Sequence, residues 1–407
     1  MLPERMLPSR GHPKTTVLIA DDSAFMRSLL IRMVESDEEL SVIATAANGL
    51  EALTKINSLR PDVVTLDIDM PGMGGLEVLK RVMTDLPRPI IIVSAVSRAG
   101  AEATIEALAL GAFDCVAKSL NYGSEDVMKV QEELIGKIKA AAAAKSLAEL
   151  SSRRSYAPAR YAAAASRCST ATVAQAIGRG QAEAPQNAKL PQALPNPFVN
   201  TAPFRSAPSV IAIGTSTGGP NALQTILSGL PAELPVPIIV VQHMPAGFIH
   251  HLAERLNKFS ELKVCEAVQG QPIRAGHVYL APAGKHLTVR RLSRREVVLC
   301  LSLLPSNVMN IPSVDIMMLS IAEVFQSSAM GIVLTGMGTD GADGMQAIFR
   351  HGGHTLGQDE ATCIVYGMAR SCQERGILQE VSPLPEISSR ILAAVGMPSQ
   401  SSKSKSL

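Results

Sequence analysis

Residues 211–223 have the sequence IAIGTSTGGPNAL, which combines an apolar run, a turn containing glycines and the start of a helical pattern. An apolar strand that passes through a tight turn into a helix is the repeating unit of parallel α/β sheets. Ser216 lies at the corner of this turn. Three roles are open to it on this stretch alone: a nucleophile, a helix cap, or part of a phosphate-binding loop.

The same alternation of strand and helix extends outward from this stretch in two blocks. In the first block, strands are expected at 16–20, 41–46, 62–67, 89–94 and 113–118. In the second, strands are expected at 210–215, 237–242, 263–267, 277–281, 287–289, 297–301 and 331–335. Amphipathic segments between the strands predict an α/β protein with two parallel or mostly parallel sheets, each covered by helices on both faces.

A change of composition separates the two blocks. Residues 141–207 are rich in alanine and proline and have little periodicity, so they bury too little apolar surface to offset the entropy of ordering. We therefore expect a first domain at 15–140, a flexible linker at 141–207 and a second domain at 208–396. The polar end of the chain, 397–407, is expected to be a disordered tail.

The overall composition excludes several classes of protein. The net charge is +2, aromatic residues make up 3% of the chain and Trp is absent, so no nucleic-acid partner is expected. No apolar run is long enough to span a bilayer, and the N-terminus lacks the apolar core of a signal peptide. The six cysteines show no metal-binding spacing. These features predict a cytoplasmic protein without membrane insertion.

Polar side chains follow the strands of the first block at the points where those strands end. They are Asp21, Asp22, Asp67, Asp69, Ser94 and Lys118. The carboxyl ends of parallel strands meet at one edge of a sheet, so these groups are expected to converge. Carboxylates beside a lysine suit a divalent cation, Mg²⁺, together with a phosphoryl group. The alternative is that some of them only cap helices or lie on the surface.

In the second block, the turn around Ser216 matches neither of the common phosphate-binding patterns and lacks the lysine that one of them requires. The next strand ends in His243 instead of the acidic residue of a dinucleotide site. A serine hydroxyl needs an imidazole to take its proton, and the imidazole needs a carboxylate to orient it. Asp340 is the preferred carboxylate because Asp343 should already be helical. Taken singly, each of the three residues has an ordinary structural explanation.

The first block closely resembles the receiver domain of bacterial response regulators. The resemblance rests on IADDSAFMR, TLDIDMPGM, IIVSA and VAKS, at residues 19–27, 65–73, 91–95 and 116–119. It implies a flavodoxin-like fold in which Asp67 accepts a phosphoryl group from a histidine kinase. It also implies that Asp22, Asp67 and the Asp69 carbonyl hold Mg²⁺ and that Asp21 acts through water. Ser94 and Lys118 would contact the phosphoryl oxygens.

The second block is similar to the catalytic domain of chemotaxis protein-glutamate methylesterases. The segments that carry the similarity include 211–223, VVQHMPAGF at 240–248 and GIVLTGMGTDGADGM at 331–345. The resemblance implies hydrolysis of glutamate γ-methyl esters on chemoreceptors, with release of methanol and deamidation of some glutamines. Ser216, His243 and Asp340 would be nucleophile, base and orienting acid.

The same resemblance implies that Thr217 and the Met337 backbone stabilise the oxyanion. It implies no cofactor for the esterase reaction and inhibition of the esterase by the unphosphorylated receiver. A monomer is expected. The alternative function is a phosphorylation-controlled regulator or adaptor whose hydrolase domain has lost or changed its substrate.

Overall fold

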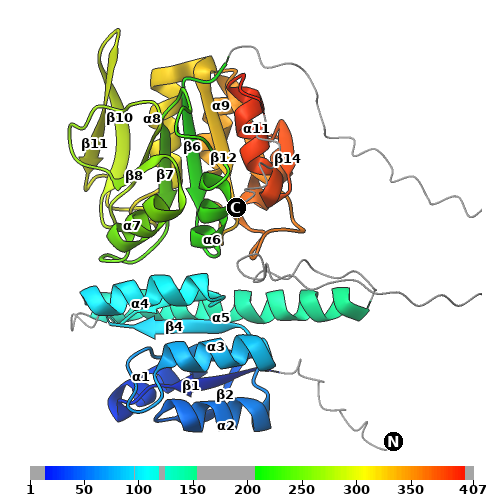
Figure 1. Cartoon of the computed structure of the whole chain (residues 1–407). Helices are drawn as coiled ribbons and strands as arrows, with labels where there is room; N and C mark the ends of the chain where they lie inside the picture. Colours follow the sequence, from blue (N-terminus) through cyan, green and yellow to red (C-terminus); the bar gives the residue numbers. More distant parts are fainter. Residues whose placement is uncertain (1–13, 96, 119–123, 154–206, 399–407) are drawn as a thin grey trace, which may run out of the picture.

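The computed structural model describes residues 14–95, 97–118, 124–153 and 207–398, and it arranges them as two α/β domains, one above the other (Figure 1). Most of the expected linker, 154–206, and the end of the expected tail, 399–407, lie outside the described residues. Each domain consists of a parallel sheet with helices on both faces, as predicted.

The first domain contains a five-stranded parallel sheet in the order β2-β1-β3-β4-β5. Its strands are β1 (Thr15–Ala20), β2 (Leu40–Ala46), β3 (Val63–Leu66), β4 (Ile90–Ser94) and β5 (Asp114–Ala117). Its helices are α1 (Ala24–Glu35), α2 (Gly49–Leu59), α3 (Gly75–Asp85), α4 (Arg98–Ala109) and α5 (Ser124–Arg153). The order reverses between β1 and β3, so both strands direct their carboxyl ends toward one crevice.

Helix α5 differs from the expectation, because it continues into the segment predicted to be a linker. A linker is predicted after residue 140 because the apolar periodicity ends there. Alanine, however, has the highest intrinsic helix propensity, and the helix continues through AAAAK at 141–145. Lys145 anchors this extension through its Nζ, 2.7 Å from Asp62 Oδ1. Among the described residues, no helix has the length and apolar character needed to cross a membrane.

The second domain contains a seven-stranded sheet in the order β14-β13-β12-β6-β7-β9-β8, and all of its pairings are parallel. Its strands are β6 (Val210–Thr215), β7 (Ile238–Gln242), β8 (Lys263–Glu266), β9 (His277–Leu280), β12 (Ala329–Val333), β13 (His354–Gln358) and β14 (Glu380–Ser382). A separate antiparallel hairpin is formed by β10 (His286–Ser293) and β11 (Glu296–Ser302). Strands β13 and β14 were not predicted, because HTLGQ and EVS lack a strong apolar pattern.

The helices of the second domain are α6 (Gly219–Leu227), α7 (Ile249–Phe259), α8 (Val314–Phe325), α9 (Ala342–Arg350), α10 (Met368–Glu374) and α11 (Ile387–Ala394). Two short 3₁₀ helices, η1 (Gln326–Ser328) and η2 (Leu384–Glu386), complete the domain. Every residue of β6 is buried, which is typical of a central parallel strand. Gly214 in this strand leaves room for α8, because a Cβ there would lie 2.2 Å from Val314 Cγ1.

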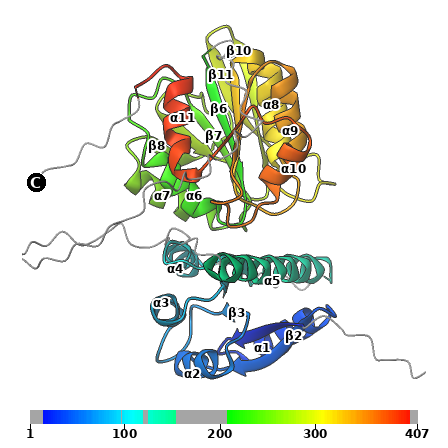
Figure 2. The same ribbon diagram turned by 90° about the vertical axis from the view of Figure 1, so that its right-hand side faces the viewer.

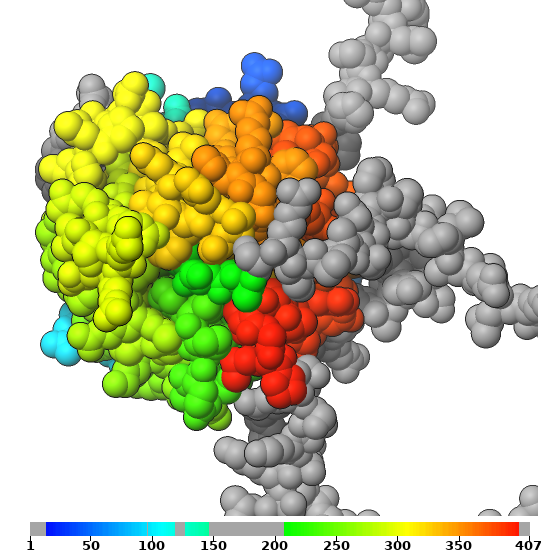
Figure 3. All heavy atoms as spheres, turned by 90° about the horizontal axis from the view of Figure 1, so that it is seen from above, coloured from blue at the N-terminus to red at the C-terminus, as the bar shows by residue number. Residues whose placement is uncertain are grey.

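The two domains contact each other through α4, α5 and the start of β5 of the first domain. Figure 2 shows both helices lying between the sheet of the first domain and the second domain. Helix α4 packs against α6 and α7, and Asn221 Nδ2 donates to the Leu108 carbonyl over 2.9 Å. Viewed from above, the second domain hides nearly all of the first (Figure 3). Thr217, which follows the carboxyl end of β6, is hydrogen-bonded to Asp114 of the first domain, so the carboxyl ends of β6 and its neighbour β7 face that domain.

Candidate functional site

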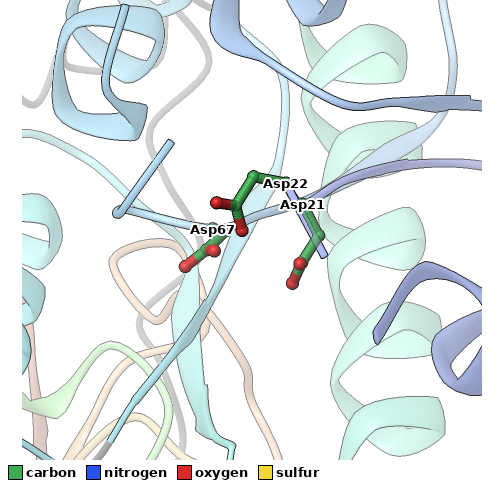
Figure 4. A group of neighbouring side chains, drawn as sticks. All are labelled: Asp21, Asp22 and Asp67. Atoms are coloured by element: carbon green, nitrogen blue, oxygen red, sulfur yellow. The ribbon is translucent and has the colours of Figure 1, made fainter. Parts of the chain in front are cut away.

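Three carboxylates meet at the crevice of the first domain. Oxygens of Asp21, Asp22 and Asp67 lie within 4.8 Å of one another, and their side chains are shown in Figure 4. Asp21 and Asp67 are buried, whereas Asp22 is exposed. Ser23 caps α1 by accepting from Met26 N at 3.3 Å, so the capping role belongs to the serine and the adjacent aspartates remain available as ligands.

Lys118 completes this acidic pocket. Its Nζ lies 2.7 Å from Asp21 Oδ2 and 2.7 Å from Asp67 Oδ2. Burial raises the pKa of Asp67 and outweighs the opposing effect of the Lys118 ammonium. Burial lowers the pKa of Lys118, but the two carboxylates reverse this effect and leave it above the usual value. The lysine is therefore held in its charged form beside the carboxylate that is predicted to be phosphorylated.

Ser94 and Asp69 have different positions around the pocket. Ser94 is buried at the end of β4, and its carbonyl accepts from Lys118 N at 2.8 Å. Its hydroxyl lies 3.4 Å from the Gly100 carbonyl. Asp69 is exposed, and its backbone N–H points to Asp67 Oδ1 at 3.4 Å. The structure thus brings the predicted residues to one edge of the sheet, with the Asp69 side chain outside the carboxylate cluster.

The second site lies at the carboxyl ends of β6 and β7. The register pairs Thr215 with Gln242, so Ser216 and His243 follow side by side. His243 N donates to the Thr215 carbonyl at 3.1 Å. Gln242 Nε2 donates to the Ser216 carbonyl at 2.9 Å and to the His243 carbonyl at 2.8 Å. Gln242 therefore fixes the two strand ends together, a role that the sequence analysis did not assign.

Asp340 comes from the turn after β12 and reaches His243. Its Oδ2 lies 2.8 Å from His243 Nε2, and both side chains are largely buried. Asp343, the alternative acid, pairs instead with Arg375. In the described part of the chain the Ser216 hydroxyl makes no hydrogen bond to His243. Hydrogen bonds between catalytic groups often form fully only when substrate is bound.

The Asp340 carboxylate accepts three further hydrogen bonds from the start of α8. Oδ1 accepts from Ser313 Oγ at 2.9 Å and from Asp315 N at 3.0 Å, and Oδ2 accepts from Val314 N at 2.8 Å. Burial would raise the pKa of Asp340, but the bonds from His243 and from these peptide groups lower it to about 2. The group is therefore a carboxylate at any ordinary pH and can orient an imidazole.

Two backbone N–H groups near Ser216 are available as donors. Among the described residues, the N–H groups of Thr217 and Met337 donate to no protein acceptor, whereas Gly219 N is used by the Ser216 carbonyl at 2.8 Å. The Thr217 hydroxyl donates to Asp114 Oδ2 of the first domain. A serine, an oriented imidazole and free backbone N–H donors are the components of acyl-transfer chemistry.

Comparisons with known proteins agree with both halves of this description. The model of the CheB methylesterase family matches residues 211–391, and that of the response regulator receiver domain matches residues 17–128. A protein-glutamate methylesterase/protein-glutamine glutaminase of Desulfitobacterium hafniense is 39% identical over 95% of this chain and 99% of its own length. The protein of the same name from Symbiobacterium thermophilum is 41% identical over 93% of this chain and 97% of its own length.

A solved structure is also similar to part of this chain. The crystal structure of the Thermotoga maritima CheB methylesterase catalytic domain is 37% identical, with a TM-score of 0.45, and it covers 46% of this chain and 99% of its own.

Proposed function

This chain belongs to the CheB methylesterase family, and we propose that it hydrolyses glutamate γ-methyl esters on the cytoplasmic helices of chemoreceptors. Glutamine side chains of the same receptors are its second class of substrate, and the reaction serves chemotactic adaptation. The observation that carries the catalytic assignment is the 2.8 Å contact between His243 Nε2 and Asp340 Oδ2, at a strand end that lies beside Ser216.

The geometry supports a separate role for each group. Because Nε2 of His243 faces Asp340, Nδ1 is the ring nitrogen left to act as the base. Ser216 Oγ attacks the ester carbonyl while Nδ1 takes its proton, and the N–H groups of Thr217 and Met337 stabilise the tetrahedral oxyanion. The imidazolium returns the proton to the departing methoxide, which leaves as methanol. Water, deprotonated by His243, then hydrolyses the glutamyl ester and frees Ser216.

We propose that phosphorylation of Asp67 by a histidine kinase controls this reaction. Asp21, Asp22 and Asp67 present hard oxygen donors that fit Mg²⁺, and the Asp69 carbonyl would add another. The bound ion would neutralise charge on the incoming phosphoryl group. Lys118 and Ser94 would contact the phosphoryl oxygens once Asp67 is modified. The largely buried Lys118–Asp67 ion pair would have to rearrange at that step, which supplies a local change for a switch.

We propose that the unphosphorylated first domain restrains the catalytic domain. Thr217, the residue after the nucleophile, is bound through its hydroxyl to Asp114, and Asn221 at the start of α6 is bound to α4. Substrate is a helix of another protein, so a domain packed over these strand ends obstructs its approach. Phosphorylation needs only to change the relative free energies of the closed and open arrangements.

The proposal is tested by incubating the full chain with methyl-labelled receptors, with and without a small-molecule phosphodonor, and measuring volatile methanol. Ser216→Ala is expected to abolish methanol release while Asp67 is still phosphorylated. Ser228→Ala, an exposed serine at the end of α6, is the matched control and should keep full activity. Methanol release by the Ser216→Ala chain would refute the assignment. A wild-type chain that is phosphorylated but releases none would favour an adaptor.

A further inference from the structure

His286, the first residue of β10, is completely buried and uses both nitrogens of its ring. Its Nε2 lies 2.9 Å from the Pro305 carbonyl, and its Nδ1 lies 3.2 Å from the backbone nitrogen of Ser313. One imidazole thus holds both ends of the segment 305–313, which connects the hairpin to α8. Neither the family resemblance nor the catalytic roles described above gives this residue a function.

The partners of His286 determine which nitrogen carries the proton. A peptide N–H can only donate, so Nδ1 must accept from Ser313 and is unprotonated. A carbonyl oxygen can only accept, so Nε2 must carry the hydrogen that is donated to Pro305. His286 is therefore a neutral imidazole, and its acceptor is directed at the residue that caps α8.

Ser313 transmits this constraint to Asp340. Its hydroxyl donates to Asp340 Oδ1 at 2.9 Å, and it begins the turn whose N–H groups bind the same carboxylate. Asp340 in turn lies 2.8 Å from His243 Nε2. Hydrogen bonds therefore run without a gap from His286 through Ser313 and Asp340 to the base. Because three donors from the first turn of α8 orient the Asp340 carboxylate, a displacement of that turn would displace the carboxylate as well.

We propose that His286 is a positioning residue for the hydrolysis, acting through its Nδ1 on the Ser313 N–H and thereby on the orientation of Asp340 toward His243. This inference rests on the proposed function, since it concerns the same three catalytic residues. The orienting effect depends on Nδ1 of His286. Substitutions of similar size can therefore separate the loss of this acceptor from the loss of side-chain volume.

Two substitutions separate the two nitrogens. His286→Asn keeps an acceptor oxygen at the position of Nδ1, and His286→Gln keeps a donor near the position of Nε2 but removes the acceptor facing Ser313. In the full chain with phosphodonor, we expect kcat of the Gln variant to fall about 10- to 100-fold with KM little changed, because small misplacements of catalytic groups have effects of that size. The Asn variant should keep most of its activity.

The control is the same pair of substitutions at His277, on strand β9, whose Nδ1 lies 2.9 Å from the Ala275 carbonyl and whose ring stacks on Tyr279. Both control variants should match the wild type. The low-field proton resonance of the His243–Asp340 hydrogen bond gives a second readout, which should persist in His286→Asn and be shifted or lost in His286→Gln.

Several results would overturn the proposal. Equal kcat in the Asn and Gln variants would do so, and so would higher activity of the Gln variant. Loss of the native fold in both would mean that His286 is a core residue and no more. If the wild type releases no methanol, the proposed function fails instead, and the proton resonance still tests whether His286 positions Asp340.

Discussion

Asp114 connects the first domain to Thr217, the residue that follows the proposed nucleophile Ser216. It is buried, and its Oδ2 accepts from the Thr217 hydroxyl. Its Oδ1 accepts from Cys115 N at 2.7 Å and lies 3.2 Å from Lys137 Nζ. Burial favours the neutral amine, but the charges of Asp114 and Glu133 outweigh it and raise the pKa of Lys137. We expect that removing Asp114 weakens the closed arrangement.

The size of the effect follows from the kind of hydrogen bond. A bond to a charged acceptor contributes about 1.5–3 kcal/mol net, and each 1.4 kcal/mol is about tenfold in an equilibrium constant. Loss of the Asp114–Thr217 bond should therefore shift the equilibrium toward the open arrangement by about 10- to 100-fold. The basal activity should rise by the same factor until it reaches the rate of the fully phosphorylated chain.

The change is made as Asp114→Ala with Lys137→Met, which removes the 3.2 Å Asp114–Lys137 ion pair as a whole. Methanol release is measured without phosphodonor and then with it. The matched control is Asp37→Ala with Lys139→Met, which removes another aspartate–lysine ion pair. Asp37 lies on the loop between α1 and β2, 2.7 Å from Lys139 of α5. Unchanged basal activity in a folded Asp114 variant would refute the reasoning, as would an equal rise in the control.

Three further predictions follow from the two sites. Asp340→Asn should lower kcat by about 10⁴-fold, because the imidazole loses the carboxylate that fixes its tautomer; this is measured as methanol release at saturating receptor, and a loss below tenfold would contradict it. Chelation of Mg²⁺ should abolish phosphorylation of Asp67 by small phosphodonors, and Asp22→Ala should lower it; retained phosphoryl incorporation in EDTA would contradict the assignment of the acidic pocket. Burial, reinforced by the charge of Asp340, raises the pKa of Asp315 from 3.8 to about 6, so its contribution to stability is full below pH 3.8 and is lost as the pH rises through 6. In the wild type the free energy of unfolding should fall by up to about 3 kcal/mol between pH 4 and 7 because of this group, and Asp315→Asn should remove that fall. Denaturant titrations across this pH range measure it, and the same dependence on pH in the variant and the wild type would contradict the prediction.

The sequence predicted those parts of the sites that depend on where strands end. Ser216 and His243 follow apolar strands directly, and parallel pairing brings such positions together without further information. The choice of Asp340 over Asp343 depended on where a helix begins. In the structure Asp340 is hydrogen-bonded to the His243 imidazole, and Asp343 forms an ion pair with Arg375.

The residues that support these groups could not be predicted, because their partners are distant in the sequence. Ser313 resembles any helix cap, and His286 resembles any histidine in a strand; only the packing of α8 on β6 shows that both lead to Asp340. Asp114 was expected only as part of a strand, and its partner Thr217 belongs to another domain. Gln242 is different, because a polar residue at the end of an apolar strand can be recognised in the sequence as a candidate supporting residue.

The central claim is that Ser216 is a nucleophile activated by His243 and Asp340, and one labelling measurement tests it most directly. The phosphorylated full chain is treated with a fluorophosphonate serine probe, and the modified peptide is identified by mass spectrometry. The account predicts a stoichiometric adduct on Ser216 that is lost in a folded His243→Ala chain. A folded wild-type chain with no adduct at Ser216, or equal labelling after His243→Ala, would contradict it.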